Sequence, residues 1–183
     1  MGHSGCLASL VGLVIEGYRA VEIEVKIRAL MLDPNSGTPI IILKDLNSDT
    51  MLPIWVGAYE ANAIALEIEK VAPQRPMTHD LLRNFIIEMG AEIVRVIVTE
   101  LQDNTFFAVI EIKTEDGGLL VLDSRPSDAI ALALRADCPI FVNDEVISAS
   151  RNSSTGDETD SETETEAAEE WPDVIGEAGD LPM

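Results

Sequence analysis

Cysteine is scarce in this chain of 183 residues, which contains only Cys6 and Cys138, more than a hundred residues apart. Disulfide frameworks and thiolate metal sites need several cysteines at short spacings, so the sequence excludes both. A protein without structural disulfides suits a reducing compartment. We therefore predict a cytoplasmic protein.

Long hydrophobic runs are also absent. The longest charge-free stretch, residues 1–15, is interrupted by three glycines, whereas a membrane-spanning helix needs ~20 apolar residues. The stretch also lacks the basic leader and the small-residue cleavage site of an export signal. We predict no membrane partner and interpret residues 1–20 as a poorly ordered N-terminal extension. A translation start assigned too far upstream would give the same pattern.

Positive charge is the third shortage, because 12 Lys and Arg stand against 33 Asp and Glu and give a net charge of −21. Proteins bind nucleic acid largely by neutralising its phosphates with Lys and Arg. The composition therefore argues against tight, unaided binding to a duplex. We expect any nucleic-acid partner to be short or single-stranded and weakly bound, held by a few local positive groups inside a cleft.

Residues 151–183 hold much of the acidity, with eleven acids and one base. Their low hydrophobicity and like charge leave too little apolar surface to offset the entropy of ordering the chain. We predict an acidic disordered tail. Its simplest role is to keep the protein soluble, and the alternative is that it docks on a basic partner or mimics nucleic acid.

Residues 21–150 show the patterns of a folded domain. Val21–Arg28 alternates apolar and charged residues, as a half-buried strand does, whereas Ala58–Val71 places apolar residues at helical spacing. Further strands are predicted at Pro39–Leu46, Thr50–Val56, Glu92–Leu101, Thr105–Thr114, Leu119–Asp123 and Pro139–Val142. Further helices are predicted from the N-cap Thr78 to Gly90, from Pro126 to Arg135, and as one or two turns over Asp144–Ala149.

The order of these elements predicts the fold class. Strands and helices do not alternate regularly, so we expect a single compact α+β domain with a mixed, mainly antiparallel sheet and three to four helices. The residues Ala-Ile-Ala-Leu occur at 63–66 and again at 129–132, in two different predicted helices. Because small residues allow helices to pack closely, we predict that these two helices share one core, with chance similarity as the alternative.

Two helices are predicted to begin with nearly the same residues, Arg75-Pro76-Met77-Thr78-His79-Asp80 and Arg125-Pro126-Ser127-Asp128. A helix N-terminus with an arginine and a hydroxyl beside it binds phosphate well. In this functional interpretation the candidate substrate-binding residues are Arg75, Thr78, Arg125 and Ser127. In the structural interpretation, the hydroxyls cap their helices and each arginine pairs with the aspartate that follows it.

The common enzyme signatures are absent, so candidates for catalysis come from single residues. His79, the only histidine in residues 21–150, is a candidate general base, because imidazole is the side chain best suited to exchange protons near neutral pH. The alternative is a hydrogen-bonded helix-start residue. The carboxylates nearest to element ends are Glu60, Asp80, Asp123 and Asp128. If two of them meet, they can hold a divalent cation such as Mg²⁺ or Mn²⁺ that activates water.

Three motifs carry a resemblance to a known family. The runs LPIWVGAYEA at Leu52–Ala61, RPMTHDL at Arg75–Leu81 and DSRPSDAIALA at Asp123–Ala133 resemble the bifunctional nuclease (BFN) domain. The resemblance covers about Val21–Ser148, with the motifs in family order. The matching positions are Gly57, Glu60, Arg75, Thr78, His79, Asp80, Asp123, Arg125, Ser127 and Asp128.

The resemblance implies a nuclease, because plant relatives are credited with cleaving both DNA and RNA, and a compact domain that tends to self-associate. We therefore expect a DNase, an RNase or both, acting on phosphodiester bonds as a homo-oligomer. The alternatives are a non-catalytic regulatory module that binds an anion or a phosphate-bearing ligand, and an oligomer whose motifs are structural. Residues 151–183 show no counterpart of the plant relatives' additional module.

Overall fold

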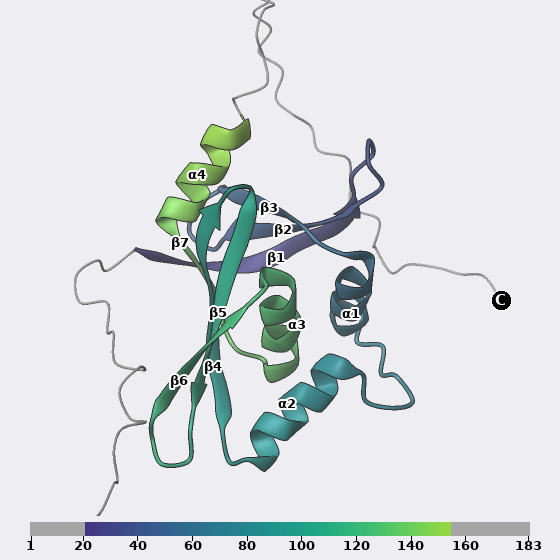
Figure 1. The fold of residues 1–183 in the computed structure, drawn as a ribbon. Coiled ribbons are helices and arrows are strands. Elements are labelled where there is room, and N and C mark those ends of the chain that lie inside the picture. Colours follow the sequence, from purple (N-terminus) through teal and green to yellow (C-terminus); the bar gives the residue numbers. More distant parts are fainter. Residues whose placement is uncertain (1–20, 155–183) are drawn as a thin grey trace, which may run out of the picture.

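The computed structural model describes residues 21–154, which form one seven-stranded sheet and four helices (Figure 1). The strands are β1 (Glu22–Leu32), β2 (Pro39–Asp45), β3 (Met51–Trp55), β4 (Glu92–Gln102), β5 (Thr105–Lys113), β6 (Leu119–Ser124) and β7 (Ile140–Asn143). The helices are α1 (Ala58–Ile68), α2 (Thr78–Glu88), α3 (Pro126–Ala136) and α4 (Asp144–Ser154). The predicted α+β class is confirmed.

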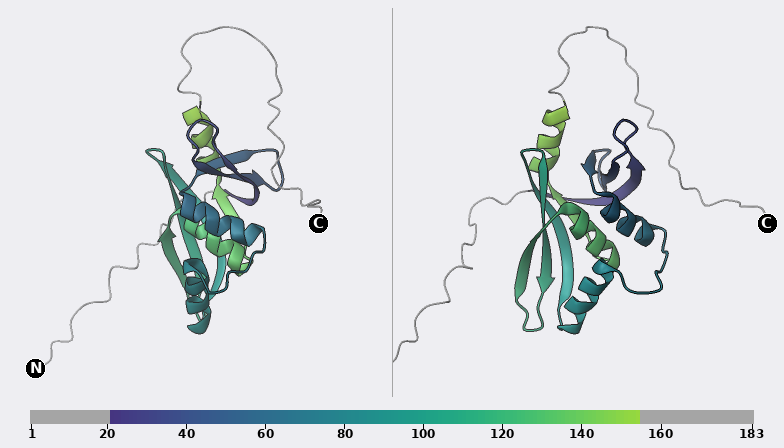
Figure 2. Two further views of the ribbon diagram at one scale, coloured as in Figure 1. Left: turned by 90° about the vertical axis from the view of Figure 1, so that its right-hand side faces the viewer. Right: turned by 45° about the vertical axis from the view of Figure 1, so that its right-hand side comes forward.

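The sheet joins two meanders through β7, in the strand order β3-β2-β1-β7-β4-β5-β6. Neighbouring strands are antiparallel except for β4 and β7, which are parallel. The sheet is therefore mixed and mainly antiparallel, as predicted. Figures 1 and 2 show β1–β3 running across the direction of β4–β6, so the sheet turns strongly between its two halves.

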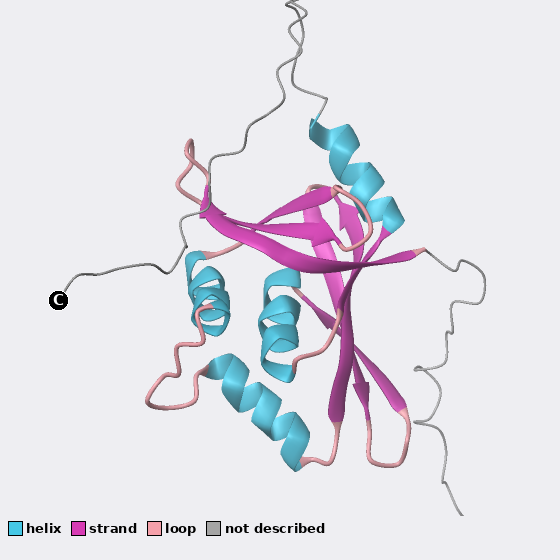
Figure 3. Ribbon diagram, turned by 180° about the vertical axis from the view of Figure 1, so that it is seen from behind, coloured by secondary structure: helices cyan, strands magenta, loops and turns pink. Residues whose placement is uncertain are grey.

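Helix α3 occupies the centre of the molecule. It contacts β4 and β5 on one side and α1 and α2 on the other, and the views from the front and from behind agree on this arrangement (Figures 1 and 3). Buried residues of α1 and α3 include Ala63, Ile64 and all of Ala129–Ala133. The prediction that the two Ala-Ile-Ala-Leu helices share one core is thus confirmed, because small residues let them approach closely.

Two predicted boundaries were wrong. The last helix, α4, extends from Asp144 to Ser154 rather than ending after one or two turns, and Arg151 in its last turn suits the negative end of the helix dipole. The N-cap of α2 is Met77, and Thr78 is the first helical residue. The Asp80 carboxylate, at the third helical position, accepts a hydrogen bond from the Met77 N–H at 2.8 Å, so the backbone donor that is satisfied here is the one of the N-cap residue itself.

The interpretation of residues 1–20 as an N-terminal extension lies outside the described residues. The acidic tail was predicted to be disordered from residue 151, but residues 151–154 are the end of α4, and the rest of the predicted tail lies outside the described residues. Within residues 21–154, none of the helices combines the length and the apolar character that crossing a bilayer would require.

Candidate functional site

The N-terminus of α3 places an arginine beside an aspartate. Arg125 is the N-cap and Pro126 is the first helical residue, a position that suits proline because its fixed φ matches the helix and no N–H is needed there. Asp128 lies in the first turn, where the helix dipole favours a carboxylate. Arg125 Nε donates to Asp128 Oδ2 at 2.7 Å. For this helix, the pairing expected in the structural interpretation is confirmed.

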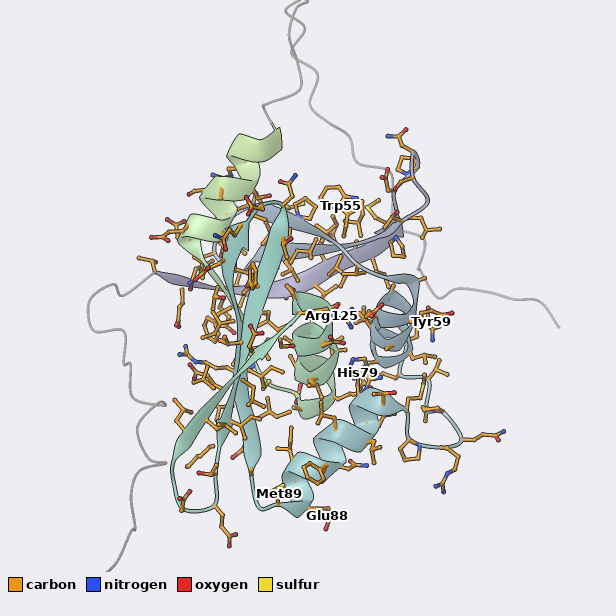
Figure 4. The ribbon with its side chains drawn as sticks, in the orientation of Figure 1. Trp55, Tyr59, His79, Glu88, Met89 and Arg125 are labelled. Carbon is orange, nitrogen blue, oxygen red and sulfur yellow. The ribbon has the colours of Figure 1, made fainter. Side chains whose placement is uncertain are left out.

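Two residues from other helices complete the group. Arg125 Nη2 donates to Glu60 Oε1 of α1 at 2.8 Å, and His79 Nε2 of α2 lies 3.1 Å from Asp128 Oδ1. We call Glu60, His79, Arg125 and Asp128 the Arg125 cluster. Figure 4 shows Arg125 and His79 where α1, α2 and α3 approach one another. Four of the nine residues predicted for the site are thus brought together by three helices.

The cluster is open to solvent at one end and covered at the other, since the side chain of Arg125 is 66% exposed and that of His79 is 14% exposed. Burial acts to raise the pKa of Asp128, but hydrogen bonds from Arg125 and His79 outweigh it and hold that pKa below its usual value. Asp128 and Glu60 in turn raise the pKa of Arg125. Asp128 is therefore ionised at neutral pH.

The ionised carboxylate also sets the tautomer of His79. A carboxylate only accepts hydrogen bonds, so Nε2 carries the hydrogen and donates it to Asp128 Oδ1, and in the neutral ring Nδ1 keeps the lone pair. Nδ1 has no hydrogen-bond partner in residues 21–154 and is not among their buried unpaired atoms, so it reaches solvent. An imidazole held in this way can accept a proton from water.

Asp80 belongs to a second group of contacts. Its Oδ1 accepts a hydrogen bond from Arg135 Nε at 2.6 Å. The Arg135 side chain, only 4% exposed, also donates to the carbonyl oxygens of Ala131 and Ala63 at 2.8 and 3.1 Å. Burial acts to raise the pKa of Asp80, but the bonds from the Met77 N–H and Arg135 prevail and lower it. Arg135 therefore links α1, α2 and α3.

Arg135 was missed by the sequence analysis. The available signal was its position in an otherwise apolar stretch of α3, because a charge in a buried helix needs a partner. The structural interpretation instead paired Asp80 with Arg75, which was wrong. Arg75 is exposed in the loop before α2, and Asp80 pairs with Arg135, 55 positions further along the chain.

The other predicted residues have separate positions. Thr78 is exposed at the start of α2. Ser127 is buried in the first turn of α3, and the prediction that its hydroxyl caps this helix was wrong, because the N-cap is Arg125 and makes no side-chain capping bond. Asp123 is exposed on β6. A cavity of about 360 Å³ lies between the end of α1 and the loop that precedes α2. Among the predicted site residues, Asp80 is the one that lines this cavity.

The acidic side chains do not fit a metal site built by the protein alone. Within residues 21–154, no three His, Cys, Asp or Glu side chains are grouped so that they could hold a metal ion. Glu60 and Asp128 approach each other only through Arg125, whose guanidinium lies where a shared cation would bind. Mg²⁺ is often held by one or two carboxylates together with substrate phosphates. The Arg125 cluster offers at most two carboxylates, those of Glu60 and Asp128.

The fold and the site define an α+β domain in which three helices meet at a linked arginine, aspartate and histidine. The chain belongs to the bifunctional nuclease domain family, whose family model matches residues 41–155. The resemblance seen in the three sequence motifs is therefore confirmed, and all four members of the Arg125 cluster lie inside the matched region.

Individual relatives extend this comparison. An uncharacterized protein of Mycobacterium tuberculosis is 37% identical over 147 residues, which cover 80% of this chain and 87% of the relative. Bifunctional nuclease 1 of Oryza sativa subsp. indica is 28% identical over 63% of this chain, and bifunctional nuclease 1 of Arabidopsis thaliana is 30% identical over 57%. The matched part amounts to about a third of each plant protein's length, 36% and 33%.

Proposed function

We propose that this protein is a nuclease that hydrolyses phosphodiester bonds in DNA, RNA or both, with the Arg125 cluster as its active site. Membership of a nuclease family supports the reaction class. The single observation that carries the proposal is that Arg125 and His79 bind the two oxygens of one carboxylate, Asp128. Phosphodiester hydrolysis needs a group that holds phosphate and a group that activates water next to each other.

Arg125 is suited to hold the phosphate. Its Nε and Nη2 are used by Asp128 and Glu60, which leaves Nη1 without a partner among the described residues, on a side chain that is two-thirds exposed. The two acids fix the guanidinium but also offset its charge, so the four groups sum to −1 when His79 is neutral. We therefore expect weak binding of a short or single-stranded substrate.

His79 is suited to activate the attacking water. Its open Nδ1 accepts the proton while the water oxygen bonds to phosphorus and the P–O bond to the leaving sugar oxygen breaks, and that oxygen takes a proton from solvent. Asp128, with its lowered pKa, stays ionised and stabilises the imidazolium, which returns its proton to solvent. Water as the nucleophile requires no 2′-hydroxyl on the substrate. One site of this kind therefore serves DNA and RNA alike.

The divalent cation expected from the sequence, Mg²⁺ or Mn²⁺, accompanies the substrate phosphates in this proposal and is not bound by a preformed cage. No step at Arg125 or His79 is assigned to it. Rates measured with EDTA and with added Mg²⁺ or Mn²⁺ test the expectation. Stimulation by metal that survives in the Glu60→Gln variant would place the cation away from Glu60.

The central test is cleavage of short, end-labelled single-stranded DNA and RNA. We expect His79→Ala and Asp128→Asn to slow cleavage by about 100-fold or more, the usual contribution of a general base. Asp49→Asn is the matched control, because Asp49 is an almost fully exposed aspartate that pairs with Lys44 in a turn. Wild-type protein that leaves both substrates intact under every metal condition would contradict the proposal.

A second candidate function is a non-catalytic regulatory module that binds a phosphate-bearing ligand at Arg125. The observation that favours it is that Arg125 is held in place by two acids while Nη1 stays without a partner among the described residues, which is enough to bind an anion and requires no catalytic group. Calorimetry with AMP and with a short oligonucleotide separates the two functions. Binding that is lost in Arg125→Ala, from a wild-type protein that cleaves nothing, would establish the regulatory module.

We also propose that the protein acts as a homo-oligomer. Exposed apolar side chains on β6 and α2 support this proposal, because soluble monomers rarely leave contiguous apolar surface uncovered. Sedimentation of the purified protein over a range of concentrations tests it directly.

A further inference from the structure

The two outermost strands among the described residues differ in how they are protected. On β3, Pro53 in the middle of the strand removes a backbone donor, which is a common protection against pairing with another chain. On β6, Leu119, Leu120, Val121 and Leu122 follow one another without a proline or a charge, and the pairing with β5 has no bulge. Each of these four side chains is 40–61% exposed. Such an edge is a template for another strand.

The apolar side chains of β6 cover both faces of the strand. Leu120 and Leu122 lie opposite Ile112 and Ile110 of β5, on the face that carries the helices. Leu119 and Val121 lie opposite Lys113 and Glu111, on the outer face. A new strand at this edge would therefore gain main-chain hydrogen bonds and apolar contacts on both faces.

The charges beside the edge identify the occupant. Lys113 and Asp123 are exposed on the outer face at opposite ends of β6, and neither has an ion pair within residues 21–154. Lys113 has Glu92 of β4 opposite it on one side, whereas Asp123 lies opposite the apolar Val109. A strand that complements the edge therefore brings a base to the Asp123 end and can bring a second acid to the Lys113 end. A second copy of this chain, turned by a two-fold axis, does both.

We propose that two copies of the chain pair through β6 in antiparallel orientation, so that the sheet continues from one copy into the other. Two registers keep matching faces together and make three apolar pairs each, with either Leu120 or Val121 at the axis. The register with Val121 opposite Val121 of the second copy is the one that also brings Asp123 of that copy next to Leu119, on the Lys113 side. Leu120 then lies opposite Leu122, and Leu119 lies opposite Asp123. Lys113, across from Leu119 on the other side, is about 10 Å from Asp123 of the second copy between Cα atoms, which is within reach of a lysine side chain.

This inference names the surface behind the proposed self-association and is independent of the nuclease proposal. The rival occupant is residues 7–15 of the same chain, Leu-Ala-Ser-Leu-Val-Gly-Leu-Val-Ile, which are apolar and uncharged. That segment has no charge to meet Lys113 or Asp123. The second copy is therefore the better match.

The test is sedimentation equilibrium of the full chain and of charge variants. We expect Val121→Lys, which sets two like charges opposite each other at the axis, to weaken the dimer by about 100-fold or more, and Asp123→Lys or Lys113→Glu by about tenfold each, because every contact occurs twice. The double variant Asp123→Lys with Lys113→Glu should recover most of the affinity. Glu24→Lys and Lys26→Glu on β1 are exposed controls with the same charge changes.

The outcomes separate the alternatives. A chain that stays monomeric at every concentration would overturn both the interface and the proposed self-association. A dimer that is indifferent to Val121→Lys would overturn the interface alone. Backbone amides of β6 that exchange slowly in a monomer, and quickly in Val11→Pro, would show that residues 7–15 cover the edge and would also overturn the proposal.

Discussion

The N-termini of α2 and α3 contain the same residue types in the same order, namely arginine, proline, a hydroxyl residue and aspartate, yet their contacts differ. At α3, Arg125 is the N-cap and lies three positions before Asp128, so its guanidinium folds back onto that carboxylate. At α2, Arg75 lies five positions before Asp80, outside the helix, and Asp80 binds Arg135 instead. The comparison teaches that the number of residues between an arginine and an acid decides whether a helix start forms its own ion pair.

Loss of Arg135 should give the largest effect. Arg135→Met leaves Asp80 without its charged partner and removes the side-chain hydrogen bonds to two helix carbonyls, so we expect a loss of about 3 kcal/mol in the free energy of unfolding. Urea titration measures it. The matched substitution Arg75→Met should change stability by less than ~0.5 kcal/mol, because Arg75 is exposed. Equal losses would mean that the α2 start depends on its own arginine after all.

The two aspartates should separate stability from activity. Asp80→Asn weakens the bond to Arg135 and the cap on Met77, and we expect a loss of about 2 kcal/mol in stability with cleavage retained. Asp128→Asn should lower the free energy of unfolding by only about 1 kcal/mol, because its cluster is partly exposed, but should slow cleavage by about 100-fold or more through the wrong tautomer of His79. Thermal melts and cleavage rates on the same samples measure both quantities. If Asp80→Asn is stable but inactive, Asp80 is needed for cleavage, and it would then belong to the same site as the Arg125 cluster.

A contact could be predicted from the sequence when its two residues are close together along the chain. The strands and helices follow from local periodicity, and the contact between Arg125 and Asp128 is local too, so both were accessible. The contact of His79 with Asp128 joins residues 49 positions apart, and that of Arg135 with Asp80 joins residues 55 positions apart. Those contacts depend on how α2 packs against α3, which the hydrophobic pattern of either helix alone does not determine.

The edge strands show a related limit. The residues of β6 were predicted as a strand, but its place at the end of the sheet arises because β7 inserts between β1 and β4. Asp123 was grouped with the other acids because it lies near the end of a predicted strand and inside a family motif, whereas the structure places it on that edge. Motif membership alone therefore did not reveal which acids meet.

Acid should weaken both helix starts in the same pH range. The pKa values of Asp80 and Asp128 are lowered from 3.8, so the native state binds protons less readily than the unfolded chain does. Their contribution to stability is present above 3.8 and is lost as the pH falls below it, through their lowered native pKa values. Urea titrations across this range should show a smaller dependence on pH in Asp80→Asn than in the wild type. An unchanged slope would mean that other carboxylates dominate acid unfolding.

The smallest effect should come from a substitution at Gly57, the N-cap of α1. This residue lies beside Glu60 of the Arg125 cluster, so the substitution should affect the α3 start and not the α2 start. A Cβ at this position would lie 2.2 Å from Glu60 Oε2, so in Gly57→Ala the Glu60 carboxylate must move away from Arg125. Because exposed ion pairs contribute little, we expect a loss of only about 0.5 kcal/mol in stability, with a measurable shift in the NMR resonance of Arg125 Nε. If the effect passes through Glu60, the same substitution should leave that resonance unchanged in a Glu60→Ala background. If the resonance still shifts in the Glu60→Ala background, Gly57 acts through the backbone of α1 and not through Glu60. The N-terminus of α1 would then also help to position Arg125.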